Sequence, residues 1–140
     1  MSTTLVSISN DELRQVLQTQ VLSAATTLSA ADSSKVFTLN AAAGAQITLP
    51  AVADAAGQNY RFIVGALFAT TAWTIRAASA VIQGGAIVNS VLVSSANRNL
   101  ITFAHAADTV GDYVELVCDG TNWYVNGIGT AAGAITFTTV

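Results

Sequence analysis

The sequence predicts an all-β fold: an antiparallel β-sandwich or β-barrel, jelly-roll-like, preceded by a short N-terminal arm or helix. From Val36 onward, short runs rich in β-branched and aromatic residues alternate with Gly, Asn, Asp and Pro, which is typical of sandwiches and barrels. Two such runs flank Asp119-Gly120-Thr121-Asn122, and Asp-Gly supplies the positive φ angles of a hairpin turn. The length of 140 residues suits one domain with one core.

Residues 1–34 are predicted to form an N-terminal arm. Ser9 and Glu12 fit a capping box at the start of a short amphipathic helix. Such a helix is marginal alone, so its apolar stripe needs a partner, either its own β domain or another protein. The apolar residues that follow the cap at helical spacing are Leu13, Val16, Leu17 and Val21.

The second half of the arm, residues 23–34, is nearly all Ala, Ser and Thr and is interpreted as a linker. The predicted boundary therefore lies near Lys35, with a β-sandwich domain over residues 35–140. Within the arm, we expect the apolar side chains to attach the protein to a partner. These residues are Leu5, Val6, Ile8, Leu13, Val16 and Leu17.

The β domain divides into about nine or ten strands at its turn residues. Pro50 is expected to end one strand, because proline cannot donate a ladder hydrogen bond. The strand before the hairpin alternates Val114 and Leu116 with Tyr113 and Glu115, so one face is core. The expected strands lie near 36–39, 45–49, 60–65, 73–77, 80–83, 86–93, 99–103, 112–118, 122–128 and 134–138.

Composition excludes several classes of protein. Charged residues make up 9% and hydrophobic residues 52% of the chain, so we expect the surface to be completed by subunit contacts. No apolar run reaches the roughly 18 residues of a membrane helix, and the acidic N-terminal region does not resemble a signal peptide. The net charge of −3 and scattered basic residues disfavour nucleic acid.

Few residues could support catalysis. His105 is the single histidine and Cys118 the single cysteine, which is too few for a four-ligand zinc site in one chain. Cys118 lies in a predicted strand and is interpreted as a buried structural thiol. The carboxylates near the hairpin are interpreted as solvated turn acids. We therefore expect no enzymatic activity, no catalytic residue, no metal and no cofactor.

Aromatic side chains could bind sugar by stacking, although aromatics in a small β domain are mostly core. Trp123 and Tyr124 are adjacent in a predicted strand, so they point to opposite faces. Trp73 and Tyr124 are the candidates for an exposed aromatic contact of this kind.

The segment from Gly111 to Val125 resembles a G-D-x-V-x-L-x-x-D-G-T-N-W-Y-V pattern of bacteriophage virion proteins, and residues 37–62 resemble the earlier strands of the same domain. The resemblance covers roughly residues 28–130. It implies a trimeric surface protein of the capsid decoration (cement), head-fibre or tail-fibre type, and it implies no catalytic residue.

The leading hypothesis is a homotrimeric decoration protein that binds the major capsid protein and stabilises the head. Its location would be the virion surface, after synthesis in the cytoplasm of the host bacterium. Two alternatives stay open: a fibre or spike domain that binds a host receptor or glycan, and a minor assembly or tail-adaptor protein. The first hypothesis predicts many symmetric copies per particle, whereas the adaptor hypothesis predicts a few.

Overall fold

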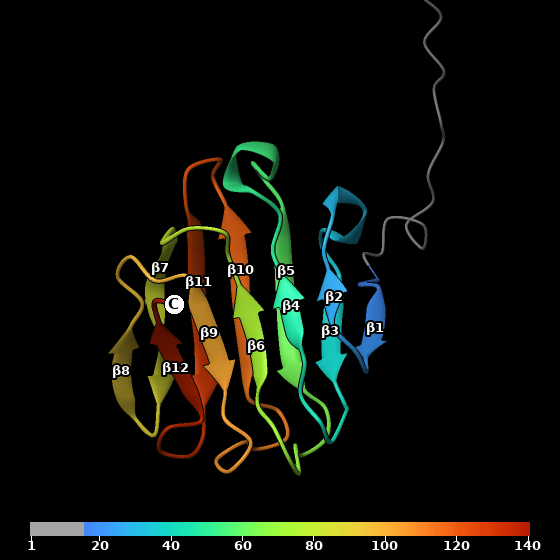
Figure 1. The fold of residues 1–140 in the computed structure, drawn as a ribbon, viewed down its shortest axis with the longest axis vertical. Coiled ribbons are helices and arrows are strands. Elements are labelled where there is room, and N and C mark those ends of the chain that lie inside the picture. Colours follow the sequence, from blue (N-terminus) through green and yellow to red (C-terminus); the bar gives the residue numbers. More distant parts are fainter. Residues whose placement is uncertain (1–15) are drawn as a thin grey trace, which may run out of the picture.

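The computed structural model describes residues 16–140 and shows two β-sheets packed as a sandwich (Figure 1). One sheet has seven strands in the order β1-β3-β5-β10-β11-β7-β8, and the other has five in the order β12-β9-β6-β4-β2. The predicted all-β class and the sandwich are therefore confirmed. The strands are β1 Thr19–Leu22, β2 Thr26–Thr27, β3 Val36–Leu39, β4 Gln46–Thr48, β5 Asn59–Val64, β6 Trp73–Arg76, β7 Ile82–Val88, β8 Val91–Ser94, β9 Leu100–Phe103, β10 Tyr113–Cys118, β11 Trp123–Gly129 and β12 Ile135–Thr138.

The sheets are mixed, so the prediction of an antiparallel arrangement is wrong. From β1 to β6 the chain crosses to the opposite sheet after each strand and returns beside the strand it left. Because each return runs in the same direction, β1-β3-β5 and β2-β4-β6 pair in parallel, and parallel neighbours always need a crossover connection between them. The strand β7 also pairs in parallel with β11.

The C-terminal half contains the antiparallel pairs, and its hairpin is confirmed. The strands β10 and β11 pair from Cys118 opposite Trp123 to Tyr113 opposite Ile128. Gly120 has a φ angle of 93° in the connecting loop, a conformation that glycine adopts without steric cost. This hairpin occupies the middle of the seven-stranded sheet, where β5 and β7 flank it.

The core lies between the two sheets and contains most of the large aromatic side chains. Every second side chain of a strand points into this core. In β10 the side chains of Val114, Leu116 and Cys118 are buried, whereas Val117 is exposed. Cys118 is a buried free thiol, as predicted. Burial of apolar surface of this kind is the main stabilising term of the fold. The largest buried side chains include Trp73, Trp123, Tyr60, Phe37, Phe62 and Phe103.

The N-terminal predictions need correction where the structure describes them. Val21 lies in β1, so the predicted amphipathic helix does not extend over this residue. Residues 23–34 contain β2 and a 3₁₀ helix at Ala30–Asp32 instead of being a plain linker. Because β1 pairs with β3 and β2 pairs with β4, the sandwich begins before the predicted boundary at Lys35. Short threonine-containing strands at a sheet edge give a weak sequence pattern.

Candidate binding surface

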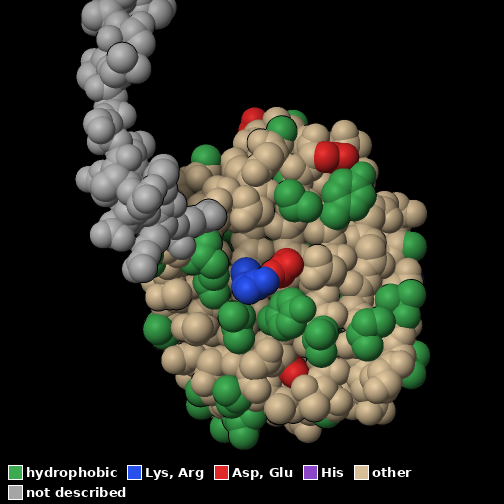
Figure 2. Space-filling model, turned by 180° about the vertical axis from the view of Figure 1, so that it is seen from behind, with side chains coloured by type: hydrophobic (Ala, Val, Ile, Leu, Met, Phe, Trp, Pro, Cys, Tyr) green, Lys and Arg blue, Asp and Glu red, His purple; other side chains and the backbone are tan. Residues whose placement is uncertain are grey.

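The outer face of the seven-stranded sheet carries a row of mostly apolar side chains that crosses every strand. Register fixes this row, because directly paired residues in neighbouring strands point to the same side of a sheet. Figure 2 shows green side chains aligned across this face. We call these residues the apolar row; in spatial order they are Val21, Thr38, Ile63, Tyr113, Ile128, Ile87 and Leu92.

Beside the apolar row, the central strands carry an ion pair between Arg61 and Glu115. These two residues face each other across β5 and β10. Figure 2 shows adjacent blue and red groups near the centre of the face. The Arg61 guanidinium also lies 5.5 Å from the centre of the Tyr113 ring, within the range of a cation–π contact. The positive charge at the centre of the face is thus compensated locally.

A groove of about 290 Å³ crosses the same face beside the ion pair. Leu17 and Lys35 line it near the β1 edge, and Tyr124 and Asn126 line it on β11. Its walls combine apolar side chains with carboxamide groups and the Arg61–Glu115 pair. A groove with mixed apolar and polar walls can hold a short segment of polypeptide or a small polar molecule.

Tyr124 projects from β11 at the inner end of this groove, and 43% of it is exposed. Its hydroxyl donates a hydrogen bond of 3.0 Å to Asp119 Oδ2 in the hairpin loop. The backbone amides of Asn122 and Thr121 also donate to Asp119 and, with Tyr124, hold the pKa of that carboxyl below its usual value. The predicted exposure of Tyr124 is confirmed.

Trp73 does not lie on any outer surface, so the prediction that it is exposed is wrong. It points inward from β6, is 0% exposed and packs against Phe68 with ring centres 6.4 Å apart. Its indole Nε1 lies 3.4 Å from the backbone oxygen of Ala41. The alternation of Trp73 and Ile75 places both in the core of the five-stranded sheet.

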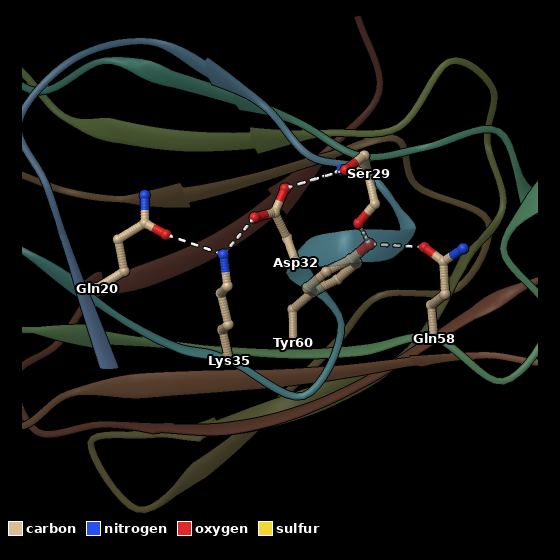
Figure 3. Close-up of polar contacts among 6 residues, drawn as sticks. All are labelled: Gln20, Ser29, Asp32, Lys35, Gln58 and Tyr60. Carbon is tan, nitrogen blue, oxygen red and sulfur yellow. Dashed lines mark hydrogen bonds and ion pairs between the residues drawn. The ribbon is translucent and has the colours of Figure 1, made fainter. Parts of the chain in front are cut away.

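The edge of the seven-stranded sheet next to β1 is fixed by a polar cluster (Figure 3). Lys35 Nζ lies 2.7 Å from Asp32 Oδ1 and donates to Gln20 Oε1 at 3.2 Å. Asp32 also accepts a bond from the Ser29 amide. The hydrogen bond from Lys35 is the main cause that lowers the pKa of Asp32. The cluster therefore holds β1 and the 3₁₀ helix against the sandwich.

The hydroxyl of Tyr60 extends this cluster from β5. It lies 2.7 Å from Gln58 Oε1 and 3.0 Å from the backbone oxygen of Ser29, so its one proton can serve either acceptor. Burial raises the pKa of Tyr60 to about 12, with Asp32 and Cys118 adding to the shift. This contact ties the start of the 3₁₀ helix to the core.

The predicted attachment residues are only partly described. Leu5, Val6, Ile8 and Leu13 lie outside the described residues. Val16 and Leu17 are 84% and 47% exposed where the described chain begins, and Leu17 lines the groove. The described part of the predicted attachment segment thus presents apolar side chains to solvent beside β1.

The carboxylates near the hairpin have structural partners. Asp112 is buried and accepts hydrogen bonds from the Thr130 amide and hydroxyl and from the Thr109 amide. Asp108 accepts a bond of 2.7 Å from the Phe68 amide. Both carboxylates therefore fix loops at one end of the sandwich. Because Asp112 is buried, its interpretation as a solvated turn acid is wrong.

Within residues 16–140, no three His, Cys, Asp or Glu side chains gather closely enough to hold a metal ion. Cys118 Sγ lies 3.4 Å from the Gly120 amide, and burial raises the pKa of its thiol. A thiol with a raised pKa is a weak nucleophile at neutral pH. None of the helices in this part of the chain is both long and apolar enough to cross a membrane.

Sequence reasoning missed most of the apolar row. Ile63, Ile87 and Ile128 lie in predicted strands, and the alternation of residues in β11 already separated Ile128 from the buried Val125. The missing information was the pairing of β11 with β7 and of β10 with β5, which aligns these side chains.

Comparison with protein-family models, curated proteins and solved structures finds no match for this chain.

Proposed function

We propose that this chain is a structural protein of a bacteriophage virion, a homotrimeric capsid decoration protein that binds the major capsid protein and stabilises the head shell. The observation that carries the proposal is the broad outer face of the seven-stranded sheet, with its exposed apolar row and compensated ion pair. Such a face suits contact with protein surfaces. The resemblance to virion proteins falls on β10 and β11, which form the centre of this face.

The N-terminal arm is the part that we assign to shell attachment. Val16 and Leu17 are exposed beside β1, and fifteen further residues precede them in the sequence. Apolar residues of the arm would be buried between neighbouring shell subunits, at a gain of about 25 cal/mol per Å² removed from water. The polar cluster of Lys35, Asp32 and Gln20 would transmit this anchorage to the sandwich.

In this mechanism, binding is itself the function. A protein that binds only the assembled shell stabilises it by mass action, by about 2.7 kcal/mol per site at a free concentration one hundred times the dissociation constant. Three linked arms bind more tightly than one through effective concentration. The shell would then resist the outward pressure of packaged nucleic acid.

Cosedimentation with shells of the phage that encodes the chain tests this assignment. The truncation should remove residues 1–17 and keep Gln18, because its oxygen accepts a bond from the Val36 amide as β1 begins. We expect loss of shell binding with an unchanged unfolding temperature. A matched control replaces Ser2, Ser7 and Gln15 by alanine and should bind normally. Full decoration by the truncated protein would contradict the role of the arm.

A second candidate function is glycan binding by a fibre or spike domain, and the exposed ring of Tyr124 favours it. Asn126 and the Arg61–Glu115 pair lie in the same groove, so a sugar ring stacked on Tyr124 would find hydrogen-bonding partners nearby. Tyr124→Ala should then abolish binding on a glycan array, whereas Trp73 is buried and cannot contribute. Glycan-array silence together with shell binding would reject this alternative.

A further inference from the structure

The two outer faces of the sandwich differ in chemistry although they belong to one fold. The outward positions of the five-stranded sheet are mostly threonine, with Gln46, Arg76 and Leu100 among them. Threonine favours strands and offers a hydroxyl to water, so this face is suited to solvent. The threonines, placed by register, are Thr27, Thr48, Thr74, Thr102, Thr136 and Thr138.

The seven-stranded sheet uses a different set of residues at the equivalent outward positions. Ile87 and Ile128 face each other across β7 and β11 and remain 46% and 48% exposed. Leu92 continues the row on the edge strand β8. Strand propensity alone would be met by threonine, as on the other sheet, so the isoleucine and leucine side chains indicate a face that is covered.

The charges on this face allow an identical surface to meet it. Arg61 and Glu115 form an ion pair with each other, and the Arg61 guanidinium also contacts the Tyr113 ring. A strongly charged partner would find no complementary charge here, whereas a second copy brings the same compensated pair. Tyr and Arg are also the residue types that are enriched at the centres of interfaces.

We infer that the outer face of the seven-stranded sheet is the surface through which copies of this chain associate, with the apolar row at the contact. The outer face of a seven-stranded sheet with strands of about six residues measures about 30 by 20 Å at the usual strand spacing. Two such faces would bury about 1,200 Å² together, which reaches the lower limit of about 1,200 Å² for specific interfaces. The occupant is therefore a second copy of the chain.

This inference deepens the self-association part of the proposed function and does not rest on the virion assignment. A twofold axis places this face against the same face of a second copy, whereas around a threefold axis the face meets a different surface of the next copy. In either arrangement the neighbouring row residues Ile128 and Ile87 are removed from water.

Sedimentation equilibrium of the full chain, across a concentration series, measures this association directly. Ile128→Lys places a charge within the apolar row, next to Tyr113, and should raise the dissociation constant by roughly a hundredfold. The matched control is Thr102→Lys, which places the same charge outward from β9 on the opposite sheet. It should leave the mass unchanged. Cooperative thermal unfolding of each variant checks that the sandwich is intact.

If Ile128→Lys does not fold, Ile87→Lys tests the paired position on β7. Oligomers of the wild type and of Thr102→Lys, together with monomers of the apolar-row variant, support the inference. A monomeric wild type overturns it, as does an apolar-row variant that stays fully associated. A wild-type monomer whose shell binding is lost in Ile128→Lys would instead assign the face to the shell. Loss of shell binding without loss of self-association would contradict the inference and leave the proposed function standing.

Discussion

Tyr60 joins the N-terminal segment to the core through one hydroxyl. Its ring packs among Phe37, Phe62 and Trp123, while the hydroxyl reaches Ser29 and Gln58 at the rim. A buried tyrosine commonly finds a polar partner in this way.

Tyr60→Phe should lower the free energy of unfolding by about 1 kcal/mol at neutral pH, the usual cost of one lost hydrogen bond. The pKa of Tyr60 is about 12 in the folded state and about 10 when unfolded. The wild type is therefore fully stabilised below pH 10 and loses this contribution as pH rises toward 12. Urea unfolding should show a smaller difference in free energy of unfolding between the wild type and Tyr60→Phe at pH 11 than at pH 8. An equal difference at both pH values would contradict the stabilising role of the Tyr60 hydroxyl.

Asp119 stabilises the β10–β11 hairpin only while it is ionised. Its pKa is lowered in the folded state, so its contribution is present above the unfolded value of about 3.9 and is lost as pH falls through the folded pKa. We expect Asp119→Asn to unfold at a lower temperature than the wild type near pH 6, and the difference in unfolding temperature to shrink as pH falls toward 2. Thermal unfolding across this range measures the difference.

Asp54→Asn provides the control for loss of one negative charge. Its backbone oxygen accepts a bond from Gln58, and its carboxylate takes part in no hydrogen bond among the described residues, so this variant should unfold at the wild-type temperature near pH 6. If the difference in unfolding temperature between Asp119→Asn and the wild type stays constant from pH 6 to pH 2, the ionised carboxylate of Asp119 does not stabilise the hairpin.

At the residue scale, the sequence predicts which side of a strand is buried but not every exposed aromatic. Alternation separated Trp123 from Tyr124 correctly, and it indicated the buried thiol of Cys118. Trp73 was placed wrongly because a lone aromatic at a strand start does not reveal which face the opposite sheet covers. That information lies in the packing of Phe68 from the preceding loop.

At the level of elements, the turn between β7 and β8 offers a test of backbone strain. Asn89 and Ser90 connect the two strands with φ angles of 49° and 67°, which are the signs required by a two-residue type I′ turn. Asparagine tolerates this conformation, whereas serine is strained in it. Ser90 is therefore a position where glycine fits better.

Ser90→Gly should raise the free energy of unfolding by about 0.5 kcal/mol, since relief of the left-handed strain exceeds the added chain entropy. Chemical unfolding midpoints measure the change. Ser90→Ala keeps the Cβ atom and should give no increase. A glycine variant less stable than the wild type would contradict the turn geometry.

Most strands from β3 to β12 were predicted from turn punctuation, because Gly, Asn, Asp and Pro interrupt the β-rich runs. The paired glycines Gly84 and Gly85 misled this reasoning, since they lie inside β7 and not in a turn. A Cβ atom on Gly84 would lie 2.3 Å from the Val125 oxygen, so the glycine serves close approach of β11. Close approach between distant strands leaves no local signal.

The strands β1 and β2 escaped prediction for a related reason. Thr26 and Thr27 gain their strand conformation from pairing with β4, and the surrounding Ala and Ser residues show no period. The parallel pairs were also missed because they join segments separated by crossovers. Pairing partners in such a fold are set by tertiary contacts and not by local propensity.

For the whole molecule, the sandwich presents a threonine-rich face on one side and, on the other, a mixed face that carries the exposed apolar row. This asymmetry, and the exposed residues beside β1, fit a protein whose surface is completed by partners. The site could be predicted from sequence only as a tendency, from the low charge content. Its location required the register of the seven-stranded sheet.

We propose that this chain decorates a phage head in many copies. Quantitative mass spectrometry of purified particles of the phage that encodes the chain, combined with an image reconstruction, tests it most directly. We predict many copies in symmetric positions on the outer surface of the head, each bound through its N-terminal arm. A few copies located on the tail, or no copies in the particle, would contradict the claim.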